Sequence, residues 1–284
     1  MQSLRNLALA GAAALVLAPA VALGADMPVP PPLFKAPIVE EFGAWYLRGD
    51  IGMTNQNVGH LWNVLFDSTV VVHQKEFSSS PLFGIGLGYK MNNWLRFDGT
   101  AEYRGAATFF GFDTYLFDQG VGNPPAVRMN DYRALKSEWL FLANAYLDLG
   151  TWHSVTPFVG AGIGASRNTI SAFRDMDPTS CAACGNPWSA AVAFGNTASK
   201  WNFAWALHAG LSYQVTPNFI VELAYRYVDL GDAQSGDLIG FDGTNNIFNP
   251  MIFKHLTSND VKIGVRWMFA DTFLPEPPPL VRKY

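Results

Sequence analysis

Carboxylates and arginines share one face of several short segments, and this is the pattern in the chain that could do chemistry. In residues 95–104, Asp98 and Glu102 occupy even positions together with two arginines. A pair of carboxylates could act as general acid and general base. Carboxylates that alternate with arginines on neighbouring strands are better explained as an ion-pair network that fills an interior. We therefore predict a structural network and no enzyme activity.

The two cysteines of the chain, Cys181 and Cys184, form a Cys-Ala-Ala-Cys motif. In an exported protein this spacing most simply closes a small disulfide in a loop. A redox-active pair is the alternative, but the surrounding strand and helix pattern of such sites is missing. Gly185 stands where a c-type haem attachment motif needs histidine, and no second ligand pair for zinc follows. We predict a structural disulfide and no metal.

Strict alternation of apolar and polar residues predicts the elements that must position these side chains. In residues 261–269 the odd positions are apolar or aromatic, whereas Lys262, Gly264, Arg266 and Met268 take the even ones. Such a strand presents its two faces to two different environments. The same pattern predicts eight strands in all, at residues 44–53, 82–90, 95–104, 137–149, 158–166, 202–214, 219–228 and 261–269.

These strands suit a membrane barrel, with apolar side chains facing lipid and charged side chains facing inward. Eight is an even number, as a closed antiparallel bacterial barrel requires. The interior of such a barrel is just wide enough for side chains, so we expect no broad solute pore and no cofactor. The charges predicted to face the interior are Arg48, Asp50, Lys90, Arg96, Asp98, Glu102, Arg104, Glu138, Asp148, Glu222, Arg226, Lys262 and Arg266.

The rest of the chain predicts export and a simple domain order. Arg5 precedes an uncharged run from Leu7 to Ala22, which is typical of a signal peptide cut before Ala25. The predicted parts are a signal peptide at 1–24, a proline-rich periplasmic segment at 25–43, the barrel at 44–269 and a proline-rich periplasmic tail at 270–284. The formal net charge of −4 gives no support to nucleic-acid binding.

The connections between the predicted strands alternate in length. Residues 54–80, 105–135, 167–200 and 230–257 are long, whereas 91–93, 150–156 and 215–218 are short. Long extracellular loops and short periplasmic turns are typical of outer-membrane barrels. Because the first connection is long, both termini are expected in the periplasm. The predicted fold is thus an all-β, eight-stranded antiparallel transmembrane barrel of the Gram-negative outer membrane, surrounded by lipid and lipopolysaccharide.

Two segments resemble the OmpA-like outer membrane β-barrel family, particularly the small barrels of alphaproteobacteria. They are Glu222-Leu-Ala-Tyr-Arg-Tyr-Val-Asp-Leu-Gly231 and Asn259-Asp-Val-Lys-Ile-Gly-Val-Arg-Trp-Met-Phe269, and the resemblance covers residues 44–269. The last strand is also similar to the signal that the barrel-assembly machinery recognises. The residues that correspond to this signal are Lys262, Gly264, Trp267 and Phe269. In most such proteins the aromatic residue ends the chain, whereas fifteen residues follow here.

The resemblance implies a structural protein that supports envelope integrity. In some relatives a mature N-terminus beginning Ala-Asp and followed by prolines is joined to peptidoglycan, and here Ala25-Asp26 precede a proline-rich spacer. Ala25 is therefore a candidate for attachment to peptidoglycan, and the alternative is that Ala-Asp only suits cleavage by signal peptidase. The alternative is a surface protein that binds haemin or a host surface through its long loops. Its candidate ligands are Phe109, Phe110, Phe112, Tyr115, Phe117, His60, His73 and His255.

Overall fold

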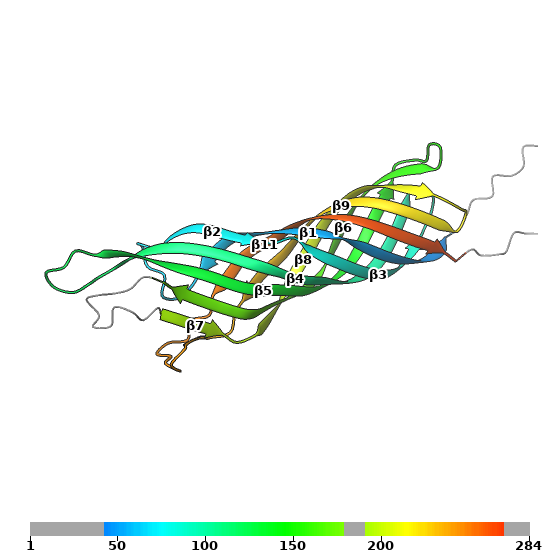
Figure 1. Cartoon of the computed structure of the whole chain (residues 1–284). Helices are drawn as coiled ribbons and strands as arrows, with labels where there is room; N and C mark the ends of the chain where they lie inside the picture. The colour runs from blue at the N-terminus through cyan, green and yellow to red at the C-terminus, as the bar shows by residue number, and fades with distance from the viewer. Residues whose placement is uncertain (1–42, 179–190, 270–284) are drawn as a thin grey trace, which may run out of the picture. The chain divides into compact units, whose positions relative to one another are not determined.

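The computed structural model describes residues 43–178 and 191–269, which belong to one compact unit. Eight long strands make up most of it (Figure 1). Within these residues no helix is long and apolar enough to cross a bilayer. The long strands are β1 (Ala44–Trp62), β3 (Ser80–Lys90), β4 (Leu95–Phe117), β5 (Ala126–Asp148), β6 (Val155–Asp177), β8 (Ala198–Gln214), β9 (Phe219–Gln234) and β11 (Ile252–Met268).

The eight strands form a closed antiparallel ring. Each strand pairs with its neighbour along the chain, from β1 with β3 to β9 with β11. The first strand also pairs with the last, in a register that runs from Tyr46 opposite Met268 to Trp62 opposite Ile252. Closure leaves no unpaired sheet edge around the ring, which is what a strand structure in lipid requires. The predicted all-β, eight-stranded fold is confirmed.

The outward side chains at one end of the ring form a belt of exposed apolar residues. Ile85 is 70% exposed, and Ile51, Phe203 and Ile263 are each more than half exposed. A continuous apolar surface of this size is not tolerated in water, so this belt faces lipid. Tryptophans lie near both margins of the belt, as in the interfacial girdles of membrane barrels. Those that are exposed there are Trp45, Trp94, Trp139, Trp201 and Trp267.

The strands are much longer than the alternation predicts, and this corrects the prediction of four long loops. Most of residues 54–80, 105–135 and 167–177 continues as strand beyond the belt. Three further strands lie there, β2 (Val71–Phe77), β7 (Ala191–Gly195) and β10 (Leu238–Gly240). β2 pairs with β4, and β7 pairs with both β6 and β10. We call this part of the sheet, beyond the belt, the extension (Figure 1, left).

The polarity of the two faces is inverted in the extension. There the inward side chains are apolar and fully buried, such as Phe109, Phe173 and Phe253. The Phe109 and Phe253 rings meet edge to face with centroids 4.9 Å apart, and Phe77 lies 5.1 Å from Phe109. Outward positions include Lys254 and other polar residues. An apolar core with a largely polar exterior is the arrangement for strands in water, so the extension lies outside the membrane.

The opposite end of the ring has short turns at residues 91–94, 149–154 and 215–218. The described chain also begins and ends there, because the backbone N–H of Phe269 donates to the carbonyl oxygen of Trp45 at 2.9 Å. Short turns at this end agree with the alternation of connection lengths in the sequence. The two ends of the described chain therefore leave the barrel on the same side, opposite the extension.

Candidate functional site in the barrel interior and extension

Within the belt, the inward face carries seven cations and seven carboxylates, all buried. Together they are the interior network. Balanced charge is expected here, because an unpaired charge in a confined interior costs several kcal/mol. The cations are Arg48, Arg96, Arg104, Lys136, Arg226, Lys262 and Arg266, and the carboxylates are Asp50, Asp98, Glu102, Glu138, Asp148, Glu222 and Asp260.

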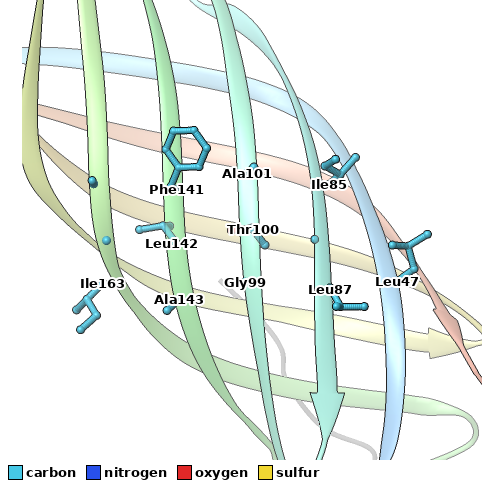
Figure 2. A pocket seen from close by; sticks show the side chains of 13 residues that line it. Leu47, Ile85, Leu87, Gly99, Thr100, Ala101, Phe141, Leu142, Ala143 and Ile163 are labelled. Carbon is cyan, nitrogen blue, oxygen red and sulfur yellow. The ribbon is translucent and has the colours of Figure 1, made fainter.

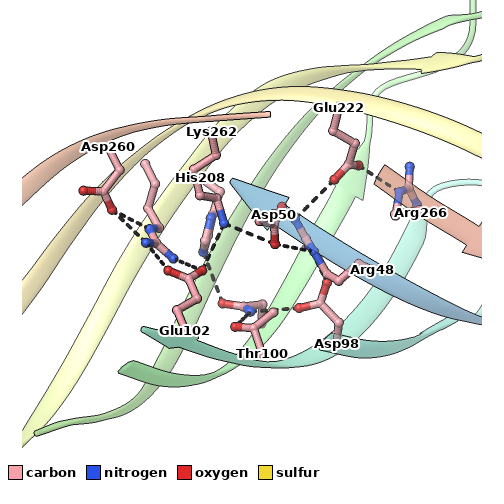
Figure 3. Close-up of polar contacts among 12 residues, drawn as sticks. Arg48, Asp50, Asp98, Thr100, Glu102, His208, Glu222, Asp260, Lys262 and Arg266 are labelled. Atoms are coloured by element: carbon pink, nitrogen blue, oxygen red, sulfur yellow. Dashed lines mark hydrogen bonds and ion pairs between the residues drawn. The ribbon is translucent and has the colours of Figure 1, made fainter. Parts of the chain in front are cut away.

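Arg48 is the centre of the network near the turns (Figure 3). Its guanidinium nitrogens lie 2.8 Å from Asp50, 2.7 Å from Asp98 and 3.3 Å from Glu222. The hydroxyl of Tyr46 donates to the Asp98 carboxylate at 3.1 Å. Three strands, β1, β4 and β9, thus meet at one arginine, which is suited to this role because its planar donors can satisfy several carboxylates at once.

A second arginine group completes this end of the interior. Arg96 lies 3.1 Å from Asp148 and Arg266 lies 2.9 Å from Glu222. The Arg96 guanidinium also lies over the ring of Tyr146, 4.2 Å from its centroid. The aromatic ring supplies a favourable face to a cation whose water has been removed.

Glu102 is the centre of the network nearer the extension. Arg226 donates to both of its oxygens, at 2.7 and 2.6 Å, and Lys262 donates at 3.2 Å. The same arginine donates to Asp260 at 2.9 Å. Asp260 in turn pairs with Arg104, which also donates to Glu138 at 2.7 Å. Every carboxylate of this group therefore has a cation partner.

Lys262 connects the two groups, because its Nζ atom lies 3.2 Å from Glu102 and 3.7 Å from Asp50, and His208 and Asn144 lie beside this contact. The Nε2 atom of His208 lies 3.1 Å from the amide oxygen of Asn144, and the Asn144 amide nitrogen donates to Asp98 at 2.8 Å. Figure 3 shows His208 close to Lys262 and Glu102. The polar interior is thus one continuous network rather than two separate clusters.

Glycines on the inward face of β3 make room for these large side chains. A Cβ atom at Gly84 would stand 2.8 Å from Cγ of Glu102, and one at Gly86 would stand 2.9 Å from Cγ of Arg48. Both distances are shorter than real Cβ contacts allow. The glycines that alternate with apolar residues in β3 therefore permit the charged residues of adjoining strands to fill the interior.

The structure brings together all nine residues assigned from sequence to the lumen charge network, namely Arg48, Asp50, Arg96, Asp98, Glu102, Arg104, Glu222, Arg226 and Arg266. Sequence reasoning missed Lys136 and Asp260, each of which lies one residue before the predicted start of its strand. The alternation of polar and apolar residues, continued by one position toward the N-terminus of each predicted strand, would have identified both residues. Lys90 was also placed inside, but it is half-buried and has no ion pair among the described residues.

Other predicted site residues have no tested role. Lys262 and Gly264 face the interior on β11, Trp267 is exposed on the lipid side, and Phe269 follows the strand. Their part in assembly stays a prediction, as does the absence of enzyme activity. Ala25, Cys181 and Cys184, the predicted signal peptide and both predicted proline-rich segments, apart from Gly43, lie outside the described residues.

The aromatic and histidine residues proposed for haemin do not gather at one place in the sheet. Phe109 is buried in the core of the extension, whereas Phe110 and Phe112 alternate with it and face outward. His73 pairs with the Thr114 hydroxyl at 2.8 Å. In the described part of the chain, no three His, Cys, Asp or Glu residues are arranged to hold a metal ion. The histidines thus offer no preformed site.

An acidic group lies inside the far part of the extension. Asp113 accepts hydrogen bonds from the Tyr132 hydroxyl at 2.6 Å and from Asn130 at 3.0 Å. Burial and the nearby carboxylates of Asp113, Asp177 and Asp131 raise the pKa of Asp175 to about 7. The Asp175 carboxyl group therefore changes its charge near neutral pH, outside the membrane-spanning part of the strands.

Comparison with known proteins identifies related sequences. The model of the outer membrane protein β-barrel domain matches residues 8–269. An uncharacterized protein of Brucella suis is 29% identical over 241 residues, which cover 80% of this chain and 81% of that protein. A protein of Rickettsia typhi provisionally named an adhesin is 26% identical over 236 residues, 78% of this chain and 87% of that protein.

Solved structures with similar strands are also outer membrane barrels. Neisserial surface protein A is 17% identical, with a TM-score of 0.42 over 80% of this chain and 99% of that one. OprG of Pseudomonas aeruginosa is 12% identical, with a TM-score of 0.44 over 81% and 97% of the two chains.

Proposed function

Because this chain belongs to the outer membrane β-barrel family, we propose that it is a closed barrel of that membrane whose extension presents a binding surface outside the cell. Orientation is part of this proposal: the extension faces outward and both termini face the periplasm. The short turns and the chain ends at the opposite side support it, since outer-membrane barrels have short periplasmic turns.

The observation that carries the proposal is the continuous sheet of the extension around an apolar core. The part of β4 from Ala107 to Phe117 reaches about 25 Å from the belt, at ~3.3 Å per residue and a strand tilt of ~40°. Cross-strand pairing with β2 and β5 continues along this length. A sheet packed in this way holds its end at a fixed distance from the membrane, as presentation of a surface requires.

The end of the extension exposes large apolar side chains. Phe241 and Phe248 are 68% and 70% exposed in the connection between β10 and β11, and Val121 is fully exposed between β4 and β5. Exposed apolar groups on a soluble surface favour contact with another molecule. The name given to the Rickettsia typhi relative agrees with a role in adhesion. Pore formation is not favoured, because charges fill the interior at the belt and aromatic rings fill it in the extension.

Adhesion is tested by display of the protein on a non-adherent Gram-negative host and counting of bacteria bound to epithelial cells. We expect wild type to raise binding above the empty vector and the Phe241→Ser, Phe248→Ser double variant to lower it at least threefold. The matched control Val127→Ser changes an equally exposed apolar residue on another hairpin. Equal surface amounts are checked by antibody. Wild-type binding no higher than that of the vector would refute the adhesion role.

A second candidate function is support of the envelope through attachment of Ala25 to peptidoglycan. The sequence favours it, because a proline-rich spacer follows Ala25 and can adopt an extended conformation. Departure of both described chain ends from the turn side of the barrel supports the same geometry. The barrel would then connect the outer membrane to the wall, and adhesion and attachment could belong to one molecule.

A further inference from the structure

A groove of about 700 Å³ crosses the lipid-facing surface of β3, β4, β5 and β6 (Figure 2). Its floor consists of small residues, including Gly99, which lies opposite Ala143 in the register of β4 and β5. Ile85 and Ile163 stand on its two sides and are 70% and 61% exposed. A Cβ atom added at Gly99 would meet nothing within 4 Å, so the floor is open at this point.

One arginine stands on the lipid-facing side at the extension end of this groove. Arg167 follows the groove residue Ala165 by two positions on β6, so both point outward. In the register it lies between Trp139 of β5 and Trp201 of β8. Arg167 is exposed, and it has no ion-pair partner among the described residues. The cation therefore lies at the aromatic margin of the belt without a protein anion.

The aromatic residues beside Arg167 are stacked in a row. The centroid of the Phe141 ring lies 6.2 Å from that of Trp139 and 6.1 Å from that of Trp201, with interplanar angles of 11° and 28°. Phe141 also lines the groove. An apolar groove that ends at tryptophans and a cation matches the parts of a lipid molecule. A lipid has an acyl chain in the hydrocarbon and an anionic headgroup at the interface.

We propose that this groove and Arg167 bind one molecule of lipid A, with an acyl chain over Gly99 and a headgroup phosphate at Arg167. The choice of lipid A rests on the orientation proposed above, which places Arg167 in the outer leaflet. An arginine can donate two parallel hydrogen bonds to a phosphate, and such charge-assisted bonds are strong where water is scarce.

Charge argues against a second copy of this chain as the occupant. In a symmetric dimer through the groove, the same patch of each subunit faces the other. Two copies of Arg167 would then lie at one level of the membrane, where their positive charges would repel each other. A phosphorylated lipid supplies the missing anion and the apolar chain together.

The test is a titration of the purified mature protein in detergent with bisphosphorylated lipid A, followed by native mass spectrometry. We expect one lipid A per barrel, and about tenfold weaker binding for Arg167→Gln and for Gly99→Leu, which fills the groove. Gly49→Leu is the matched control, because Gly49 faces lipid on β1 and does not line this groove. The shift of folded barrels in unboiled gels verifies that all variants fold.

Three results would overturn the proposal. Equal lipid A binding by wild type, Arg167→Gln and Gly99→Leu would mean that only bulk lipid contacts this face. If phosphatidylglycerol binds as tightly as lipid A, and Arg167→Gln weakens its binding equally, the groove would be a phospholipid site. A protein dimer that Gly99→Leu abolishes, without bound lipid, would make the groove an interface between copies. None of these results bears on adhesion, since the variants tested for adhesion lie at the end of the extension.

Discussion

Replacement of Glu102 by glutamine tests whether charge balance holds the barrel interior together. Glu102 is fully buried and accepts three hydrogen bonds from Arg226 and Lys262. The change keeps the side-chain volume, but it leaves seven cations facing six carboxylates. Loss of one partner from a buried ion pair costs about 3–5 kcal/mol. Arg226 keeps Asp260, so we expect a loss of about 3 kcal/mol in the free energy of unfolding.

Urea unfolding of the barrel in lipid vesicles, followed by tryptophan fluorescence, measures this loss. Addition of Lys262→Met to the Glu102→Gln variant removes one cation and restores the balance, and we expect it to recover at least half of the lost stability. The control Arg133→Gln breaks an exposed pair with Asp131 and is expected to cost about 0–1 kcal/mol. The role of charge balance would be refuted if Lys262→Met added a further loss of unfolding free energy to that of Glu102→Gln. It would also be refuted if Glu102→Gln alone lost less than about 1 kcal/mol.

Two further predictions concern the extension and the N-terminus. Because the pKa of Asp175 is raised to about 7 in the folded protein, its protonated form stabilises the extension at low pH, and this stability is lost as pH rises through 7. Protease digestion of the extension should therefore be faster at pH 8 than at pH 6, and Asp175→Asn should remove the difference; a difference that persists in the variant would assign it to another group. In SDS-boiled sacculi digested with muramidase and protease, mass spectrometry should find a muropeptide joined to a peptide that begins at Ala25, and its absence from cells rich in the protein would exclude covalent attachment.

The part of the fold inside the membrane could be predicted because lipid imposes one rule on every strand there. Apolar residues must face outward, so a period of two residues appears in all eight segments. The interior network followed from the same rule, apart from Lys136 and Asp260, which lie one residue before the predicted starts of strands that begin at Ala126 and Ile252. Boundaries are harder to place than elements, because hydrogen bonding continues after the polarity pattern becomes weak.

The extension could not be predicted in the same way, because its outward face is largely polar and its inward face apolar. Irregular pairing also interrupts the alternation, for example between Arg104 and Ala107 of β4 and between Phe253 and Leu256 of β11. These irregularities shift the side chains from one face to the other. Arg167 was assigned to a loop, although it belongs to β6 and its pairing with both neighbouring strands is regular. Its position over the groove depends on the register of three strands, which the sequence does not reveal.

The inversion of polarity between the belt and the extension sets the depth at which the barrel can stand in a bilayer. A vertical displacement by two residues, about 7 Å along a strand, would carry Arg167 into hydrocarbon in one direction and expose aliphatic side chains to water in the other. Both displacements are therefore unfavourable. In a bilayer that is thicker or thinner than the belt, the lipids around the barrel must therefore stretch or compress while the protein keeps its height.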